Sequence, residues 1–170
     1  MGYQVVVASF VMLSLFAAPE QPNLDVTARS LVPLLKDVRR SVGTKAIVEP
    51  GTLPPSPFTG RNSTLVAVRI GFRSVNVEPK VVEAMDRLLA WNPQQPLKAE
   101  DRALVERWVE ELRVKVLGRL AATAKGVACD DACLTGHISN ASSLFGSTKR
   151  EREEARDELL LTALAEVIDE

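Results

Sequence analysis

The segment TLVAVRIGFRSVNV, residues 64–77, decides the fold class because it carries a strand pattern in a chain whose other long patterns are helical. Val66, Val68, Ile70 and Phe72 fall on one face and alternate with small or charged residues, as in an antiparallel strand with one buried face. Within residues 71–74 the alternation shifts by one position. The shift predicts a bulge or a bend in one long strand.

Helical periodicity flanks this strand on both sides. Residues 25–42, 79–91, 98–125 and 148–168 repeat apolar side chains every three to four positions. Pro33 fits the first helix best in a first turn capped by Ser30. The last helix opens on Thr148 and Glu151, which have the spacing of a capping box. Residues 126–146 are rich in Gly, Ser, Asp and Asn and are expected to be irregular.

Together these elements predict a helix-rich α+β domain, with about four helices packed on a short two- or three-stranded antiparallel sheet. The chain has 170 residues, 46% of them apolar and 25% charged, which suits one globular domain over residues 18–170. This composition excludes a chain that is disordered along its whole length. A net charge of −1 lacks the basic excess of nucleic-acid-binding proteins, so no nucleic-acid partner is expected.

Charge is divided unevenly along the chain. Residues 25–77 carry eight Lys and Arg against three Asp and Glu, whereas residues 78–170 carry 13 against 18. Ion pairing between the two halves of the domain is the favoured interpretation. The alternative is a basic surface on the first half that contacts an acidic partner or an anionic lipid.

The longest apolar run is VVVASFVMLSLFAA, 14 residues at positions 5–18. As a helix it would be about 21 Å long, too short for the ~30 Å hydrocarbon core of a bilayer, so no transmembrane span is expected. Its length, and the Ala17-Ala18 pair followed by Pro19, are typical of a secretory signal, so we predict a signal peptide at residues 1–17. The mature chain would then be secreted or periplasmic. The alternative is a core strand in a cytoplasmic protein.

Cys129 and Cys133 are the only cysteines, and His137, the only histidine, extends their spacing to C-x3-C-x3-H. A disulfide between the cysteines fits their spacing and an oxidising compartment. A zinc or copper site would use all three residues and would need a fourth ligand from Asp130 or Asp131. The third interpretation is two inert, apolar side chains near a helix end. The predicted compartment favours the disulfide.

The same three residues, Cys129, Cys133 and His137, resemble the ligand loop of the dinuclear copper site in cytochrome oxidase subunit II. That family also uses a second histidine upstream and a methionine just after the loop. This chain has neither at those places. The resemblance therefore covers three residues and does not assign the chain to the family.

Other chemical signatures are sparse. The sequence contains no G-x-S-x-G, P-loop or G-x-G-x-x-G motif, and two N-x-[ST] sequons, at Asn62 and Asn140, are candidate glycosylation sites. The favoured function is an exported, non-enzymatic binding or structural protein with an unidentified protein partner. One alternative is a periplasmic metal- or thiol-handling protein that uses the C-x3-C-x3-H cluster. The other is a cytosolic regulatory or assembly subunit. No binding residue, and no cofactor beyond the zinc or copper alternative, is identified from the sequence.

Overall fold

The computed structural model describes residues 24–47, 65–123 and 128–169. Over these residues the architecture is α+β, as predicted, with five helical segments packed on a three-stranded antiparallel sheet. The helical segments number one more than the sequence indicated. The predicted signal peptide at residues 1–17, its core-strand alternative and Asn62 lie outside the described residues. No described helix is long and apolar enough to cross a membrane.

The first helical segment changes geometry in its middle. It consists of α1 (Leu24–Leu31), a 3-10 turn (Val32–Leu34) and α2 (Leu35–Arg40). Pro33 lies in the 3-10 turn, where its missing N–H and its ring are tolerated by a local tightening of the helix. The predicted start at Ser30 is therefore wrong. The Ser30 hydroxyl donates back to the carbonyl of Val26 (3.3 Å) and does not cap a helix.

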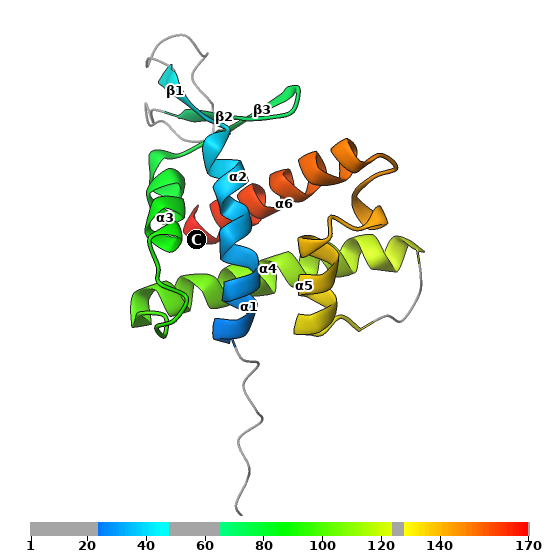
Figure 1. The fold of residues 1–170 in the computed structure, drawn as a ribbon. Helices are drawn as coiled ribbons and strands as arrows, with labels where there is room; N and C mark the ends of the chain where they lie inside the picture. Colours follow the sequence, from blue (N-terminus) through cyan, green and yellow to red (C-terminus); the bar gives the residue numbers. More distant parts are fainter. Residues whose placement is uncertain (1–23, 48–64, 124–127, 170) are drawn as a thin grey trace, which may run out of the picture.

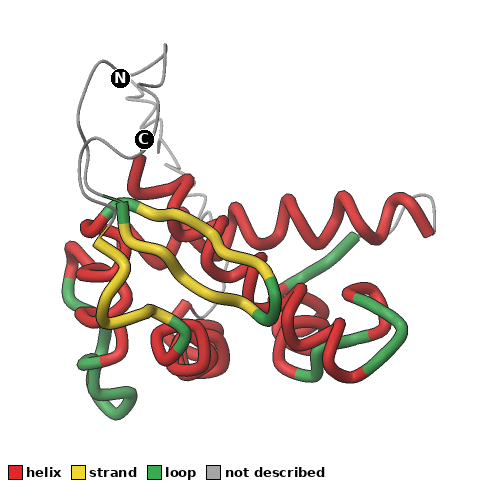
Figure 2. Tube along the Cα trace, turned by 90° about the horizontal axis from the view of Figure 1, so that it is seen from above, coloured by secondary structure: helices red, strands yellow, loops and turns green. Residues whose placement is uncertain are grey.

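The sheet has the order β1-β2-β3, with β1 (Val42–Ile47), β2 (Val66–Ile70) and β3 (Arg73–Val77) (Figure 2). The single long strand expected over residues 64–77 is wrong, because β2 and β3 form a hairpin. Gly71 and Phe72 make its turn, and Gly71 has a φ of +60°. Because only the first central residue has a positive φ, this is a type II′ turn, which suits the twist of paired strands. The shifted alternation marks this turn.

The remaining helices are α3 (Pro79–Leu89), α4 (Ala99–Thr123), α5 (Asp131–Ser139) and α6 (Lys149–Asp169), with a 3-10 turn (Ser143–Phe145) before α6. The predicted capping box at α6 is confirmed. The amide of Glu151 donates to Thr148 Oγ1 (3.2 Å), and the Glu151 carboxylate accepts from the amide of Thr148 (3.0 Å). The expectation that residues 126–146 are irregular is wrong for residues 131–139, which form α5 with Asp130 as the N-cap. Residues 126 and 127 lie outside the described residues.

The core lies where α6 packs against α2, α3, α4 and β2. Helices α4 and α6 run in opposite directions, α1 and α2 cross them, and the sheet covers one end (Figure 1). Trp108 on α4 is fully buried, and its indole N–H donates to the carbonyl of Leu160 on α6 (3.1 Å). The other largest fully buried side chains are Leu31, Leu35, Met85, Leu88, Leu112, Leu134, Ile138, Leu160, Leu161, Leu164 and Val38. This core fixes the position of α6 beneath the hairpin.

Ion pairs join residues 25–77 to residues 78–170, and the cation can lie in either half. Two described pairs have the sense expected from the charge division, Arg39–Asp86 (2.6 Å) and Arg73–Glu158 (3.4 Å). Two others have the opposite sense, Asp25–Arg102 (2.9 Å) and Asp37–Arg156 (4.0 Å). The uneven division of charge therefore does not by itself determine which residues pair.

Candidate functional site

The two cysteines lie at the N-terminal end of α5. Their Sγ atoms are bonded, with 5.2 Å between the two Cα atoms, which is inside the range that a disulfide allows. Cys129 is buried just before the helix, and Cys133 is half-buried in its first turn. The carboxylate of Asp130 accepts the amide hydrogen of Cys133 (2.8 Å), so the helix cap and the disulfide hold the same turn.

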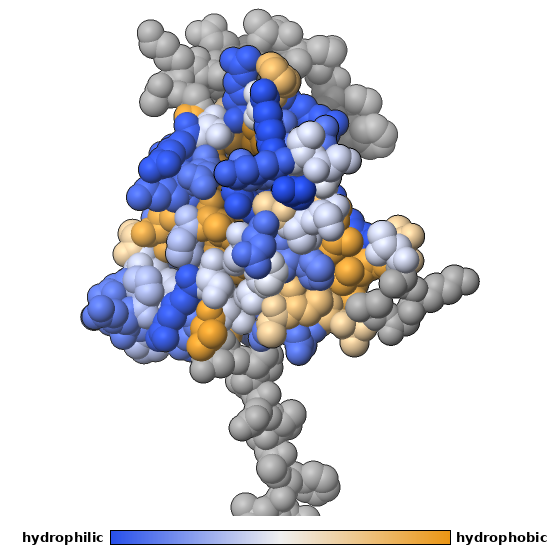
Figure 3. Space-filling model, turned by 45° about the vertical axis from the view of Figure 1, so that its right-hand side comes forward, coloured by the Kyte–Doolittle hydropathy of each residue, from blue (hydrophilic) through white to orange (hydrophobic). Residues whose placement is uncertain are grey.

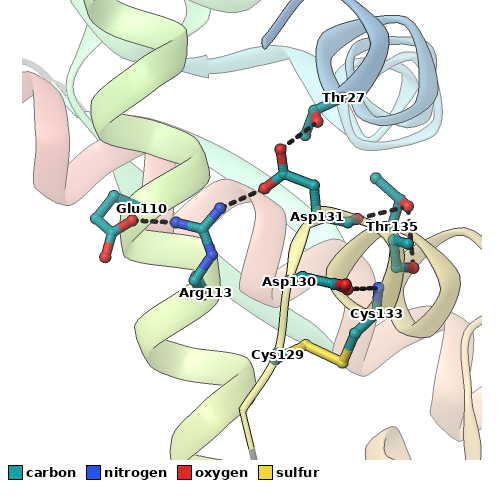
Figure 4. Close-up of polar contacts among 9 residues, drawn as sticks. Thr27, Glu110, Arg113, Cys129, Asp130, Asp131, Cys133 and Thr135 are labelled. Carbon is teal, nitrogen blue, oxygen red and sulfur yellow. Dashed lines mark hydrogen bonds and ion pairs between the residues drawn. A yellow bond between two sulfur atoms is a disulfide. The ribbon is translucent and has the colours of Figure 1, made fainter. Parts of the chain in front are cut away.

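Asp131, the next residue, joins α5 to two other helices (Figure 4). Its Oδ2 accepts from the buried hydroxyl of Thr27 on α1 (3.2 Å), and its Oδ1 accepts from the guanidinium of Arg113 on α4. Arg113 also contacts Glu110 on its own helix. The sequence suggested Asp131 as a fourth metal ligand, but both of its oxygens serve contacts between helices.

A groove of about 320 Å³ lies beside this contact, between the start of α1 and one face of α4. Its charged side chains already face one another: Arg102 pairs with Asp25 (2.9 Å), and Arg113 with Asp131. The polar lining of the groove is therefore largely engaged in holding α1, α4 and α5 together.

His137 lies at the other end of α5, where the helix stops. The amide of Ser142 donates to the carbonyl of His137 (3.0 Å), and the amide of Ala141 to that of Ile138 (3.1 Å), which together form a Schellman motif. Ala141 occupies the left-handed position, with a φ of 42°. This turn brings Nδ1 of His137 within 2.9 Å of Oγ of Ser142, and their hydrogen bond orients the imidazole.

The structure thus brings Cys129 and Cys133 together and gives His137 a different polar partner. Over the described residues, no three His, Cys, Asp or Glu side chains are grouped so that they could hold a metal ion. Asn140, the described sequon asparagine, is exposed, and its side-chain NH2 donates to the carbonyl of Gly136 (3.0 Å). Its side chain caps the C-terminal end of α5.

A second candidate site lies where the β2–β3 hairpin meets the start of α6. The turn residue Phe72 is 83% exposed, although the alternation of the sequence placed it on the buried face. The guanidinium of Arg150 lies over its ring, 4.4 Å from the centroid, and also pairs with Glu154 (2.7 Å). A Cβ on Gly71 would lie 2.2 Å from the Glu154 carboxyl carbon, so glycine permits this close approach.

Positive charge is presented more openly than negative charge around this turn. The side chains of Lys149, Arg73 and Arg150 are 83%, 78% and 62% exposed, whereas those of their partners Glu153, Glu158 and Glu154 are 46%, 36% and 33% exposed. Arg69 on β2 is exposed too. We refer to Arg69, Phe72, Arg73, Lys149 and Arg150 as the tip surface. Strongly hydrophilic side chains gather over this end of the molecule (Figure 3).

Carboxylates near the tip surface serve local contacts. Hydrogen bonds from the backbone amides of Thr148 and Ser147 lower the pKa of Glu151, whose carboxylate is turned into the N-terminal end of α6. Further along the helix, burial raises the pKa of Asp157 against the opposing effect of Arg156, whose Nε donates to it (2.9 Å). Asp157 is partly buried, and Glu151, although exposed, accepts hydrogen bonds from the amides at the start of its own helix.

No protein-family model, curated protein or solved structure matches this chain. The site must therefore be judged on its own geometry. The tip surface does not emerge from the sequence pattern, because one strand over residues 64–77 would place Phe72 on a buried face. The signal that could have located it is Gly71 within the shifted alternation, since glycine followed by one residue between two strands is typical of a type II′ turn.

Proposed function

We propose that this chain is an exported, disulfide-bonded protein that acts by binding a partner surface and not by catalysis. The observation that carries the proposal is the bond between Sγ of Cys129 and Sγ of Cys133. Disulfides persist in oxidising compartments and are rare in the cytosol. The bond therefore supports the interpretation of residues 1–17 as a secretory signal.

The surroundings of the bond support a structural role over a redox-active one. Reactive cysteines are placed where cations or free amides at a helix N-terminus stabilise the thiolate. At α5 the amide of Cys133 is already bound by Asp130, and the carboxylate of Asp131 follows directly. The amide of Cys133 is therefore not available to stabilise a thiolate. The bridge acts as a local link between the chain before α5 and the first turn of the helix.

The binding role is supported by Phe72. A phenylalanine that is 83% exposed contributes little to folding, because apolar side chains stabilise a fold by leaving water. Exposed aromatic side chains are enriched at sites that bind other molecules. The tight two-residue turn holds the ring of Phe72 in an outward position. A side chain that is already held in its binding position loses little conformational entropy when it binds.

Mass spectrometry of the protein isolated from its own host tests the proposal. Alkylation under denaturing conditions should add no label without reductant and two labels after reduction. Sequencing of the mature chain should give a start near residue 18. Two labels without reductant, together with an N-terminus at Met1, would instead support the cytosolic subunit. Free thiols with a stoichiometric zinc or copper ion would support the metal-handling protein.

A further inference from the structure

We propose that the tip surface is a contact for an anionic lipid bilayer, in which Phe72 inserts among the headgroups and the surrounding cations bind phosphates. The inference rests on the proposed binding function and names the surface and its target. Three observations carry it: the exposure of the ring, the position of the cations, and the small area of apolar surface at the turn.

The first observation is that Phe72 is an exception to the burial of large apolar side chains. Only Val26 and Val114 are other large apolar side chains exposed among the described residues, and both lie on helices. Phe72 sits at the turn of a hairpin whose core-facing neighbour Ile70 is 5% exposed. The ring is thus placed outward at a turn that is itself fixed to the domain.

The second observation is that two cations occupy an unfavourable position. Lys149 and Arg150 are the first two residues of α6, where the helix dipole favours negative charge. Neither residue contributes to the core. Each cation pairs with a glutamate four residues along α6, Lys149 with Glu153 (3.8 Å) and Arg150 with Glu154 (2.7 Å), and exposed pairs of this kind contribute little to stability. Departures from local rules that have so little benefit for folding are typical of functional sites. Here the two departures, an exposed aromatic ring and cations at a helix N-terminus, lie in contact through Arg150 and Phe72.

The third observation separates a bilayer from a protein partner. A stable protein interface buries about 800 Å² on each side and contains a cluster of apolar anchors surrounded by a polar rim. The tip surface offers one ring and well-exposed cations. A headgroup layer can close around a single ring, and long basic side chains can reach its phosphates from several angles. Acidic side chains lie nearby, and each is less exposed than the cation with which it pairs: Glu153 with Lys149, Glu154 with Arg150, and Glu158 with Arg73.

Vesicle binding tests the inference, with protein that keeps its native N-terminus and its disulfide. Sedimentation with vesicles of phosphatidylcholine and phosphatidylglycerol should retain the protein at low salt and release it at about 0.3 M salt, where charges are strongly screened. Vesicles of phosphatidylcholine alone should retain little. All variants share one N-terminus, so differences between them report on the tip surface.

Substitutions give the specific readout. Phe72→Ser should lower partitioning onto anionic vesicles about tenfold, and Lys149→Gln about fivefold. Val114→Ser is the matched control, because it removes an exposed apolar side chain from α4 and should leave partitioning unchanged. Phe72→Trp should bind as the natural protein does, and brominated lipids should quench its added fluorescence.

Two results would overturn the inference. One is equal retention of Phe72→Ser and the natural protein on anionic vesicles. The other is retention on a soluble polyanion such as polyglutamate without retention on vesicles, which would assign the surface to an acidic macromolecule. Either result leaves the mass-spectrometric test of export unaffected, so a failure of the lipid contact is distinguishable from a failure of the proposed function.

Discussion

Replacing both Cys129 and Cys133 by alanine should weaken the domain without unfolding it. The bridge joins residues separated by four positions, and closing so short a loop stabilises the folded state by about 2 kcal/mol in the chain-entropy description. Loss of the buried Cys129 sulfur adds roughly 1 kcal/mol. The total is smaller than the 5–15 kcal/mol typical of a domain. We therefore expect a decrease of roughly 5–10 °C in the melting temperature.

The effect should also be local. The first turn of α5 loses its covalent link, so the amide of Leu134, which donates to the carbonyl of Asp130 (2.9 Å), should exchange faster with solvent. The amide of Arg152 in the first turn of α6 should keep its exchange rate, because its bond to the carbonyl of Thr148 does not depend on the bridge. Hydrogen exchange followed by nuclear magnetic resonance measures both.

Reductant provides the control. It should lower the melting temperature of the natural protein by a similar amount and leave the double alanine variant unchanged. Global unfolding on reduction would refute the description of the bridge as a local link. So would faster exchange throughout α6, or equal stability of the natural protein and the double variant.

The other predictions concern α6, the hairpin and the core. Thr148→Ala removes half of the capping box and should cost about 1 kcal/mol in urea unfolding. Backbone hydrogen bonds lower the pKa of Glu151 in the folded state. The stabilisation of the fold by its carboxylate is therefore complete above the unfolded-state pKa of about 4.3 and is lost as the pH falls through the lower, folded-state pKa. The natural protein should accordingly lose more stability toward about pH 3 than the Glu151→Gln variant does. Gly71→Ala should destabilise by about 1 kcal/mol or more, since φ is +60° and the new Cβ meets a glutamate of α6, whereas Gly118→Ala, with open space around it in a helix, should stabilise by roughly 1 kcal/mol in the same thermal assay. Trp108→Phe should cost about 2–3 kcal/mol in urea, through a lost hydrogen bond and a cavity.

Features that depend on neighbouring residues could be predicted from the sequence. Pro79 begins α3, and Thr148 and Glu151 begin α6, because proline and capping residues act within one helical turn. The spacing of Cys129 and Cys133 likewise indicated which residues could be bridged. In each case the partners lie within four positions of one another, so the chain needs no tertiary context to place them.

Features that depend on packing could not be predicted in this way. Alternation assigned Phe72 to a buried face, because a shift of one position at residues 71–74 fits a bulge within one strand as well as a turn between two strands. The contacts of Asp131 with Thr27 and Arg113 exist only because α1, α4 and α5 converge. The closeness of Arg150 to Phe72 joins segments far apart in the chain.

The position of α6 has a consequence for how the protein is made. This helix packs against α2, α3, α4 and β2, and it supplies the backbone partner of Trp108. While the ribosome is still synthesising residues 149–169, the apolar sides of those earlier elements have nothing to cover them, so the nascent chain has no finished interior. The core can therefore close only after α6 has been synthesised, and until then its apolar surfaces are open to chaperones that bind unfolded chains.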